Sequence, residues 1–295
     1  MRAKPAAAEA PRRLAGIALM CGALVCFACL DASAKWVGRS VDPLVTTWAR
    51  YTFAVVLVSS VLNPVTTPGL TRTRRPWLQA GRSVLLLVST ALNFLALQHL
   101  QLTQTVSIQF AAPLIIALLG GPLLGERIGP RRLAAVAVGF LGVLVITRPG
   151  LGGIHPAAIF SVIGAVCYAL YNISTRFLAA HDSSATTVFY SNIGGALVMA
   201  AIVPFVWTAP PDALSWILLV ATGLFGAVGH WLLILAHARA PASVLAPFIY
   251  TQLLWMLGAG YLVFGDLPDR WTLPGAAIVI ASGLYLLYRE RGPRR

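Results

Sequence analysis

Apolar residues fill this sequence in successive runs of about twenty residues, each followed by a short stretch containing proline, glycine or charged side chains. A helical run of that length crosses a hydrocarbon core of roughly 30 Å. A helix also satisfies its backbone hydrogen bonds within one segment, which hydrocarbon requires. The pattern therefore predicts an all-α membrane protein of ten transmembrane helices. We expect these helices at residues 14–35, 44–62, 79–98, 102–121, 131–147, 155–178, 183–206, 214–237, 241–264 and 271–288.

The composition agrees with a membrane environment. Hydrophobic residues make up 58% of the chain and charged residues 11%, and the mean hydropathy is +0.79. A soluble domain carries roughly a quarter charged residues, so this chain has too few to cover a surface that faces water. Ten helices and their short links use nearly all 295 residues. The function must therefore reside within the helix bundle.

The formal net charge of +13 does not indicate a nucleic-acid partner. Nucleic-acid-binding domains gather basic residues on one exposed face, whereas here they stand at the ends of apolar runs. If the N-terminus is cytoplasmic, 17 basic residues fall on the cytoplasmic side and 5 on the other. This is the positive-inside bias, and it predicts that both termini are cytoplasmic. The 17 are Arg2, Lys4, Arg12, Arg13, Arg72, Arg74, Arg75, Arg82, Arg127, Arg131, Arg132, Arg176, Arg239, Arg289, Arg291, Arg294 and Arg295; the 5 are Lys35, Arg39, Arg50, Arg148 and Arg270.

The four cysteines, Cys21, Cys26, Cys29 and Cys167, all lie within apolar runs. Cys26 and Cys29 have the CxxC spacing, but a structural zinc site needs four ligands, and Cys21 and Cys167 do not form a second pair at this spacing. We interpret all four as packing residues. The sequence predicts no metal site and no cofactor.

The first apolar run also has features of a secretory leader. Arg12 and Arg13 precede it, and Ala32-Ser33-Ala34 resembles a cleavage site. We favour a retained first helix, because removal of this run would destroy the internal repeat described next.

The two halves of the sequence resemble each other. At an offset of 141 residues Leu24–Trp36 aligns with Ala165–Phe177, and at an offset of 138 the residues around His99 align with those around His237. Five helices is an odd number, so the second half enters the membrane inverted. Inverted repeats packed about a pseudo-two-fold axis are frequent in secondary transporters. Identical pairs are Val25/Val166, Cys26/Cys167, Ala28/Ala169, Ser33/Ser174, Leu97/Leu235, His99/His237, Val106/Val244 and Phe110/Phe248.

Short motifs in both halves resemble the EamA-type branch of the drug/metabolite transporter superfamily, over nearly the whole chain. In the first half they are Asp31–Trp36, Trp48–Tyr51 and Leu124–Arg127, and in the second half Ala246–Gln252, Phe264–Asp266 and Ser282–Tyr285. The resemblance implies a ten-helix inverted repeat that transports without ATP-binding domains. Such transporters handle aromatic amino acids, S-adenosylmethionine, riboflavin and other metabolites, and the motifs do not distinguish between these substrates.

The resemblance also implies a division of the chain. We expect a cytoplasmic tail at 1–13, a first five-helix EamA-like repeat at 14–148, a second at 153–290 and a cytoplasmic tail at 291–295.

Asp31 is the most informative residue, because a carboxylate within a membrane helix costs about 2.5–3.5 kcal/mol unless it faces a cavity or a partner. One interpretation is a group that binds a cation or carries a proton. The other is an ion pair with Lys35, one helical turn away. Its repeat counterpart is Asn172, which is similar in shape but uncharged.

Arg50 lies about two turns into the second predicted helix, too deep to reach the outer surface easily. Its planar guanidinium is suited to a substrate carboxylate or phosphate. The alternative is that it neutralises Asp31. We keep both interpretations.

Prolines stand inside the fourth and ninth predicted helices, at Pro113 and Pro247. Each removes a backbone hydrogen bond and frees the carbonyl four residues earlier, a defect that membranes tolerate when it lines a wet cavity. We therefore expect a binding face near these kinks, with Gln109, Tyr250 and Gln252. A bend that serves only helix packing is the alternative.

Aromatic and polar residues of the second half complete the predicted site. Tyr168, Tyr171 and Asn172 share the sixth predicted helix, and His230 lies deep in the eighth. Aromatic residues in membranes mostly serve packing or the interface, but here they are placed to stack on a planar substrate.

Together these features predict a secondary transporter in the bacterial inner (cytoplasmic) membrane. Its partners would be a small organic metabolite and the lipid bilayer, and we expect a monomer that works by alternating access. The competing hypothesis is an intramembrane enzyme acting on a lipid-linked substrate. No HExxH, GxSxG or aspartate-rich motif supports that hypothesis.

Overall fold

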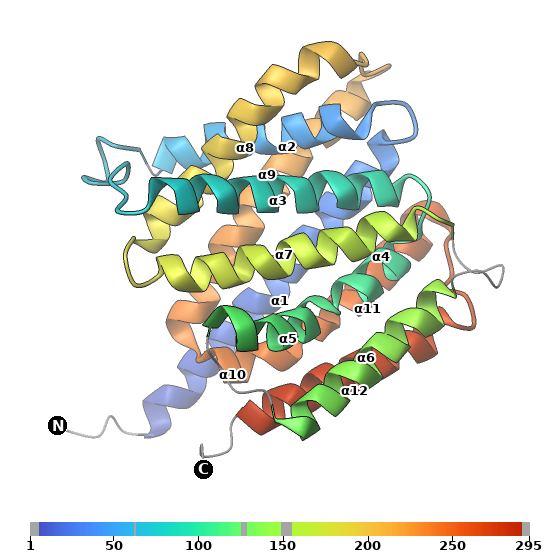
Figure 1. Ribbon diagram of the computed structural model, residues 1–295. Coiled ribbons are helices and arrows are strands. Elements are labelled where there is room, and N and C mark those ends of the chain that lie inside the picture. The colour runs from blue at the N-terminus through green and yellow to red at the C-terminus, as the bar shows by residue number, and fades with distance from the viewer. Residues whose placement is uncertain (1–5, 62, 125–128, 149–154, 291–295) are drawn as a thin grey trace.

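The computed structural model describes residues 6–61, 63–124, 129–148 and 155–290. In these ranges the chain is almost entirely helical and has no β-strand (Figure 1). The helices are α1 (Ala6–Val37), α2 (Pro43–Val61), α3 (Pro76–Leu97), α4 (Leu102–Gln109), α5 (Ala112–Leu124), α6 (Pro130–Thr147), α7 (Ala158–Leu178), α8 (Ser184–Val206), α9 (Ala213–Arg239), α10 (Ala242–Leu245), η1 (Ala246–Thr251), α11 (Gln252–Ala259), η2 (Gly260–Phe264) and α12 (Thr272–Glu290).

Each of the ten predicted membrane segments has a counterpart in the described chain. Eight helical segments are long and apolar enough to cross a membrane, and two shorter apolar helices occupy Leu133–Thr147 and Thr272–Tyr288. Residues 14–30, which have features of a leader, form the middle of α1. The predicted all-α membrane fold is confirmed.

Two of the predicted helices are interrupted in the structure. The fourth is broken between α4 and α5 at Phe110 and Ala111, just before Pro113. The ninth is divided into α10, a 3-10 turn that contains Pro247, α11 and a π-helical end. Proline has no N–H to donate to the preceding turn, so both breaks lie where the regular hydrogen bonding cannot continue.

The helices pack in a pattern that is itself two-fold. The first helix of the first half, α1, packs against α9 of the second half. The repeat-equivalent pair is α7, the first helix of the second half, packed against α3 of the first half. Likewise α2 packs on α9 as α8 packs on α3, while α2 with α8 and α6 with α12 each pair a helix with its own repeat counterpart. This exchange of partners is the packing expected of two inverted repeats.

Glycines let the helices of the first half approach α9 closely. A Cβ added to Gly223 would lie 2.4 Å from Phe53, and one added to Gly229 would lie 2.7 Å from the Phe27 ring. Gly226 lies between them and faces Leu30 and Arg50. Small residues serve this purpose in membrane bundles, and here they bring α1, α2 and α9 together around the first half's charged residues.

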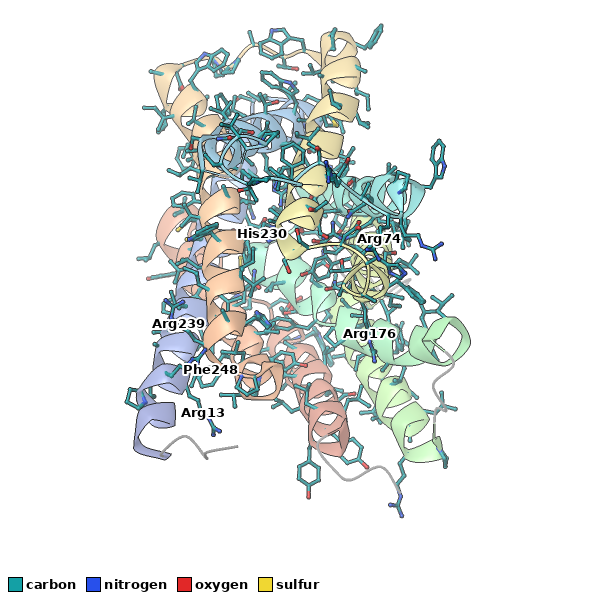
Figure 2. The ribbon with its side chains drawn as sticks, turned by 90° about the vertical axis from the view of Figure 1, so that its left-hand side faces the viewer. Arg13, Arg74, Arg176, His230, Arg239 and Phe248 are labelled. Atoms are coloured by element: carbon teal, nitrogen blue, oxygen red, sulfur yellow. The ribbon has the colours of Figure 1, made fainter. Side chains whose placement is uncertain are left out.

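The start of α1 and the end of α12 lie on the same side of the bundle (Figure 1). Figure 2 views that side, and Arg13, Arg74, Arg176 and Arg239 appear on it. The assignment of Arg82 to the same surface was wrong. Its side chain is only 3% exposed, because α3 already begins at Pro76 and Arg82 is therefore well inside the helix.

Candidate functional site

A cavity of about 350 Å³ lies between the two halves of the bundle. Residues from α1, α2, α3, α4, α5, α7, α9, η1 and α11 line it, so both repeats contribute. Nine of the residues singled out from the sequence belong to this lining, while Tyr171 and Pro247 do not. The nine are Asp31, Arg50, Gln109, Pro113, Tyr168, Asn172, His230, Tyr250 and Gln252; the others are Phe27, Leu30, Leu86, Ser89, Thr90, Asn93, Phe94, Val106, Phe110, Ala112, Ile116 and Ile249.

Asp31 projects from α1 into the cavity and is held by α3. Its Oδ1 accepts a hydrogen bond of 3.0 Å from Nδ2 of Asn93. Lys35, the alternative partner, instead lies 2.7 Å from Asp266 Oδ2 and donates to the Leu100 carbonyl at 2.9 Å. The structure therefore excludes the ion pair between Asp31 and Lys35 and leaves the Asp31 carboxylate at the cavity.

Arg50 on α2 is 8% exposed and lines the same cavity. In the described part of the chain it forms neither a hydrogen bond nor an ion pair, and its Nε is buried without a partner. The guanidinium lies 4.7 Å from the centre of the Tyr51 ring. Nε packs over Gly226, where an added Cβ would be 3.7 Å away. Arg50 and Asp31 thus share a cavity without forming a direct ion pair.

The broken helices also contribute to the cavity lining. Gln109, the last residue of α4, lines the cavity, and its side-chain Oε1 is buried without a partner. Pro113 follows the break and also reaches the lining, whereas Pro247 lies within η1 outside it. The interruption at η1 nevertheless brings Tyr250 and Gln252 to the cavity.

Tyrosine rings flank the cavity on both sides. Tyr168 lines it and stacks on Tyr171, with centroids 5.7 Å apart and an interplanar angle of 22°. Tyr250 meets Phe110 edge-on at 5.0 Å. Its hydroxyl lies directly over Gly283, where any Cβ would collide with it. The second half's Asn172 donates to the Tyr168 carbonyl at 2.7 Å.

His230 on α9 stands between two spaces. It lines the central cavity, where Phe27 packs edge-on against its ring at 5.2 Å. It also lines an apolar groove of about 580 Å³ between α2, α8 and α9.

Sequence reasoning missed a second buried arginine. Arg82 donates to the Thr175 hydroxyl at 2.6 Å, the Thr187 carbonyl at 3.0 Å and the Tyr171 hydroxyl at 2.7 Å, and also to the Ser191 hydroxyl. These five residues, here called the Arg82 network, join α3, α7 and α8. Pro76 was the available signal, because proline favours the first turn of a helix.

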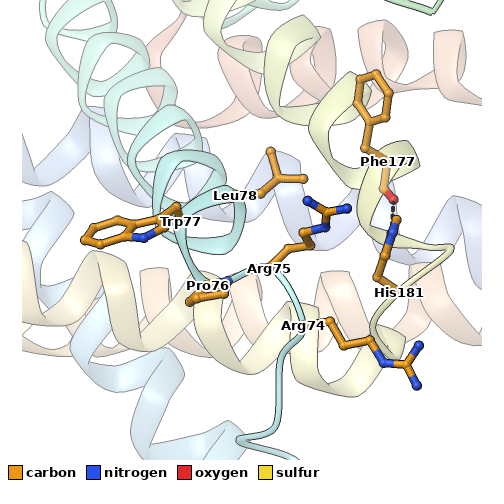
Figure 3. Close-up of a pocket in the computed structure, with 7 residues that line it drawn as sticks. All are labelled: Arg74, Arg75, Pro76, Trp77, Leu78, Phe177 and His181. Atoms are coloured by element: carbon orange, nitrogen blue, oxygen red, sulfur yellow. Dashed lines mark hydrogen bonds between the residues drawn. The ribbon is translucent and has the colours of Figure 1, made fainter.

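A different hollow lies at the end of the bundle where α3 begins and α7 ends. It measures about 610 Å³ and is lined by Arg74, Arg75, Pro76, Trp77, Leu78, Phe177 and His181 (Figure 3). His181 is tied to its own helix through the Phe177 carbonyl at 3.1 Å. Trp77 is 89% exposed. These side chains match the basic and aromatic residues that membrane proteins place at the lipid surface, so we place the functional site in the central cavity.

Carboxylates outside the membrane segments fasten the ends of the bundle. Burial alone would raise the pKa of Asp182, but hydrogen bonds from the Thr73 hydroxyl, the Arg74 backbone N–H and the Gln79 amide outweigh it and hold that pKa below its ordinary value. At the opposite end Arg148 lies 2.6 Å from Asp269. These contacts are structural.

Fold and site together define a class: a polytopic membrane protein with a central cavity built from both of its repeats, and with no catalytic motif in its sequence. Residues 14–148 match the EamA-like transporter family, and residues 155–289 match the same family a second time. The chain belongs to this family, and it is a transporter rather than an enzyme.

Named relatives cover almost the whole chain. An S-adenosylmethionine uptake transporter of Rickettsia conorii is 27% identical over 281 residues, which are 94% of each protein. A riboflavin transporter of Rhizobium johnstonii is 28% identical over 292 residues, 96% of this chain and 94% of its own length. A solved crystal structure with 16% identity superposes with a TM-score of 0.63, covering 94% of this chain and 99% of that one. This last match shows the shared fold.

Proposed function

We propose that this protein is a secondary transporter of the bacterial inner membrane that carries one small organic metabolite with an aromatic or heterocyclic part. The observation that carries the proposal is the cavity of about 350 Å³ lined by residues of both repeats. Small-molecule sites typically measure roughly 300–1,000 Å³. Relatives named for S-adenosylmethionine and riboflavin transport make these two compounds the first candidates, followed by aromatic amino acids.

Alternating access follows from the construction of the bundle. The two repeats are inverted and meet around the cavity, so that rocking one against the other opens the site to either side of the membrane in turn. The breaks between α4 and α5 and within Ala242–Phe264 interrupt the regular helix at equivalent positions of the two halves. One chain supplies both halves, which supports a monomer as the working unit.

Counterflow in proteoliposomes tests the function. Purified protein is reconstituted with unlabelled candidate inside and labelled candidate outside. Accumulation of label above that in protein-free liposomes supports transport. An intramembrane enzyme would instead convert an added substrate chemically without moving it. Absence of flux for every candidate, together with chemical conversion of one, would overturn the proposal.

Orientation is tested separately. The excess of basic residues at one end supports cytoplasmic termini, and the family matches at 14–148 and 155–289 support repeats at 14–148 and 153–290. Reporter fusions at each terminus should both be active only in the cytoplasm. Termini on opposite sides would contradict an even number of spans.

A further inference from the structure

The charges inside the cavity narrow the class of substrate, provided that the proposed function holds. We propose that the transported metabolite carries an amino-acid head group, with its carboxylate bound by Arg50, its ammonium bound by Asp31, and its planar part directed toward the tyrosines.

The first argument is the unpaired guanidinium. Arg50 is 8% exposed, its Nε is buried without a partner, and no carboxylate of the described chain forms an ion pair with it. A buried charge without a hydrogen-bonded partner costs several kcal/mol. A protein that keeps such a group beside a cavity has an open position for an anion. The planar guanidinium matches a carboxylate with two parallel hydrogen bonds.

The second argument is the carboxylate nearby. Within the described chain Asp31 accepts one side-chain hydrogen bond, from Asn93 to its Oδ1, and Lys35 is engaged by Asp266 and the Leu100 carbonyl. Asp31 therefore retains acceptor capacity toward the cavity for a cationic group. Asn93 orients the carboxylate and leaves its second oxygen available. A primary ammonium offers the donors that such an oxygen accepts.

The two charges stand on neighbouring segments of α1 and α2, because Leu30, which precedes Asp31, and Arg50 both pack against Gly226. Asp31, Arg50 and Asn93 come from α1, α2 and α3, and they line the same space without an ion pair joining the two charges. A single negative or positive ligand would satisfy one charge and leave the other. A zwitterion supplies both missing partners at once.

The remaining wall suits a flat, mostly apolar group. Phe110 and Tyr250 meet edge-on at 5.0 Å, and Tyr168 on α7 lines the same cavity. Aromatic rings of this kind stack on planar ligands. The buried Oε1 of Gln109 is an acceptor without a donor in the same space, and it fits an N–H group of a heterocycle. A neutral heterocycle without the head group would leave Arg50 unpaired.

The test uses tryptophan and two analogues that each lack one charge. Tryptamine has no carboxylate, and indole-3-propionate has no ammonium. Binding is measured for the purified full chain by ligand-induced thermal stabilisation, and S-adenosylmethionine and riboflavin are measured beside them. We expect the zwitterions to bind at least about tenfold more tightly than either single-charge analogue, the effect of one charge-assisted hydrogen bond.

Variants assign each charge to its residue. Arg50→Gln should abolish the preference for tryptophan over tryptamine while leaving the preference over indole-3-propionate. Asp31→Asn should do the reverse, and the equivalent position of the other repeat, on α7, already carries an asparagine, Asn172. Arg50→Lys keeps the charge and should restore part of the carboxylate preference. Unliganded melting temperatures control for folding of each variant.

The results separate this inference from the proposed function. Tight binding and counterflow of riboflavin, unchanged in Arg50→Gln and without binding of any zwitterion, would overturn the amino-acid head group and leave a transporter. Equal affinities for tryptophan and both analogues would also overturn it. If no compound of the panel binds or shows counterflow, both the inference and the proposed substrate range are wrong.

Discussion

Two buried arginines distinguish the two sides of this bundle. Arg82, at the junction of α3, α7 and α8, donates four hydrogen bonds and is 3% exposed. Arg50, between α2 and α9, is 8% exposed and forms no hydrogen bond within the described chain. The guanidinium donors therefore have hydrogen-bond acceptors at Arg82 and lack them at Arg50.

The difference teaches how to separate a structural charge from a binding charge. Neither arginine has a carboxylate partner in the described chain, so burial alone does not distinguish them. What distinguishes them is whether neutral neighbours satisfy the donors, because an unsatisfied buried donor costs free energy. Arg82 is satisfied by the resting protein and therefore holds helices together. Arg50 has no such neighbours in the described chain, and on the inference above a ligand in the cavity satisfies it.

The largest expected effect comes from replacing each arginine by methionine. Arg82→Met removes four hydrogen bonds that join three helices and should lower the free energy of unfolding by about 2–4 kcal/mol. Arg50→Met removes an unpaired buried charge, which is neutral or stabilising when an apolar group of similar volume replaces it. Thermal unfolding in detergent measures both, and counterflow of the wild-type substrate should be lost in Arg50→Met.

A loss of stability in Arg82→Met without a loss in Arg50→Met is the essential result. If Arg50→Met destabilises the protein as much as Arg82→Met does, Arg50 is a second structural arginine and the distinction fails.

Two tyrosine hydroxyls repeat the comparison on a smaller scale. Tyr171 accepts from Arg82 at 2.7 Å, whereas the Tyr250 hydroxyl lies over Gly283 beside the cavity. Tyr171→Phe should cost about 1–2 kcal/mol of stability, because it leaves a guanidinium donor without its acceptor. Tyr250→Phe should leave stability unchanged and alter ligand affinity. The same melting and ligand-stabilisation measurements apply, and a stability loss confined to Tyr250→Phe would reverse the assignment.

The fold was largely predictable because its signal is long and repeated. Apolar runs of about twenty residues fix helix number, and Pro113 and Pro247 lie where the fourth and ninth helices break. The extent of the second break was not predictable, since one proline does not indicate a 3-10 turn and a π-helical end.

The site was predictable only in part. Polar residues within apolar runs indicated which side chains must avoid lipid, and nine of them line one cavity. The partners of these side chains were not predictable, because they lie on helices that are distant in the sequence. Lys35 forms its ion pair with Asp266, far along the chain, and not with Asp31 one turn away. Arg82 was misassigned because an arginine near a helix start resembles a topology signal.

A smaller effect comes from the glycine under Arg50. A methyl group at Gly226 would lie 3.2 Å from Leu30, which must yield by a few tenths of an ångström, and at an ordinary contact distance of 3.7 Å from Arg50 Nε. We expect the guanidinium beside Leu30 to readjust in Gly226→Ala. We expect a several-fold loss of ligand affinity, with stability unchanged or slightly raised, since alanine favours a helix by roughly 0.5–1 kcal/mol. Gly258→Ala is the matched control, because nothing lies within 4 Å of its added methyl. Equal affinity in both variants would show that Arg50 does not need its present position.

The smallest effect concerns the end of the helices that Arg82 joins. Asp182 has its pKa held below the ordinary value by hydrogen bonds from Thr73, Arg74 and Gln79, which exceed the opposing effect of burial. A lowered pKa in the folded state means that the ionised carboxylate stabilises the fold above the ordinary aspartate value of about 3.9 and loses that contribution as the pH falls through the folded value. The melting temperature of the wild type should therefore exceed that of Asp182→Asn near pH 7, and the gap should close below about pH 4. A difference in melting temperature that stays constant with pH would mean that the charge of Asp182 does not contribute to stability. The hydrogen bonds that its oxygens accept would then be enough to join the α7–α8 link to α3.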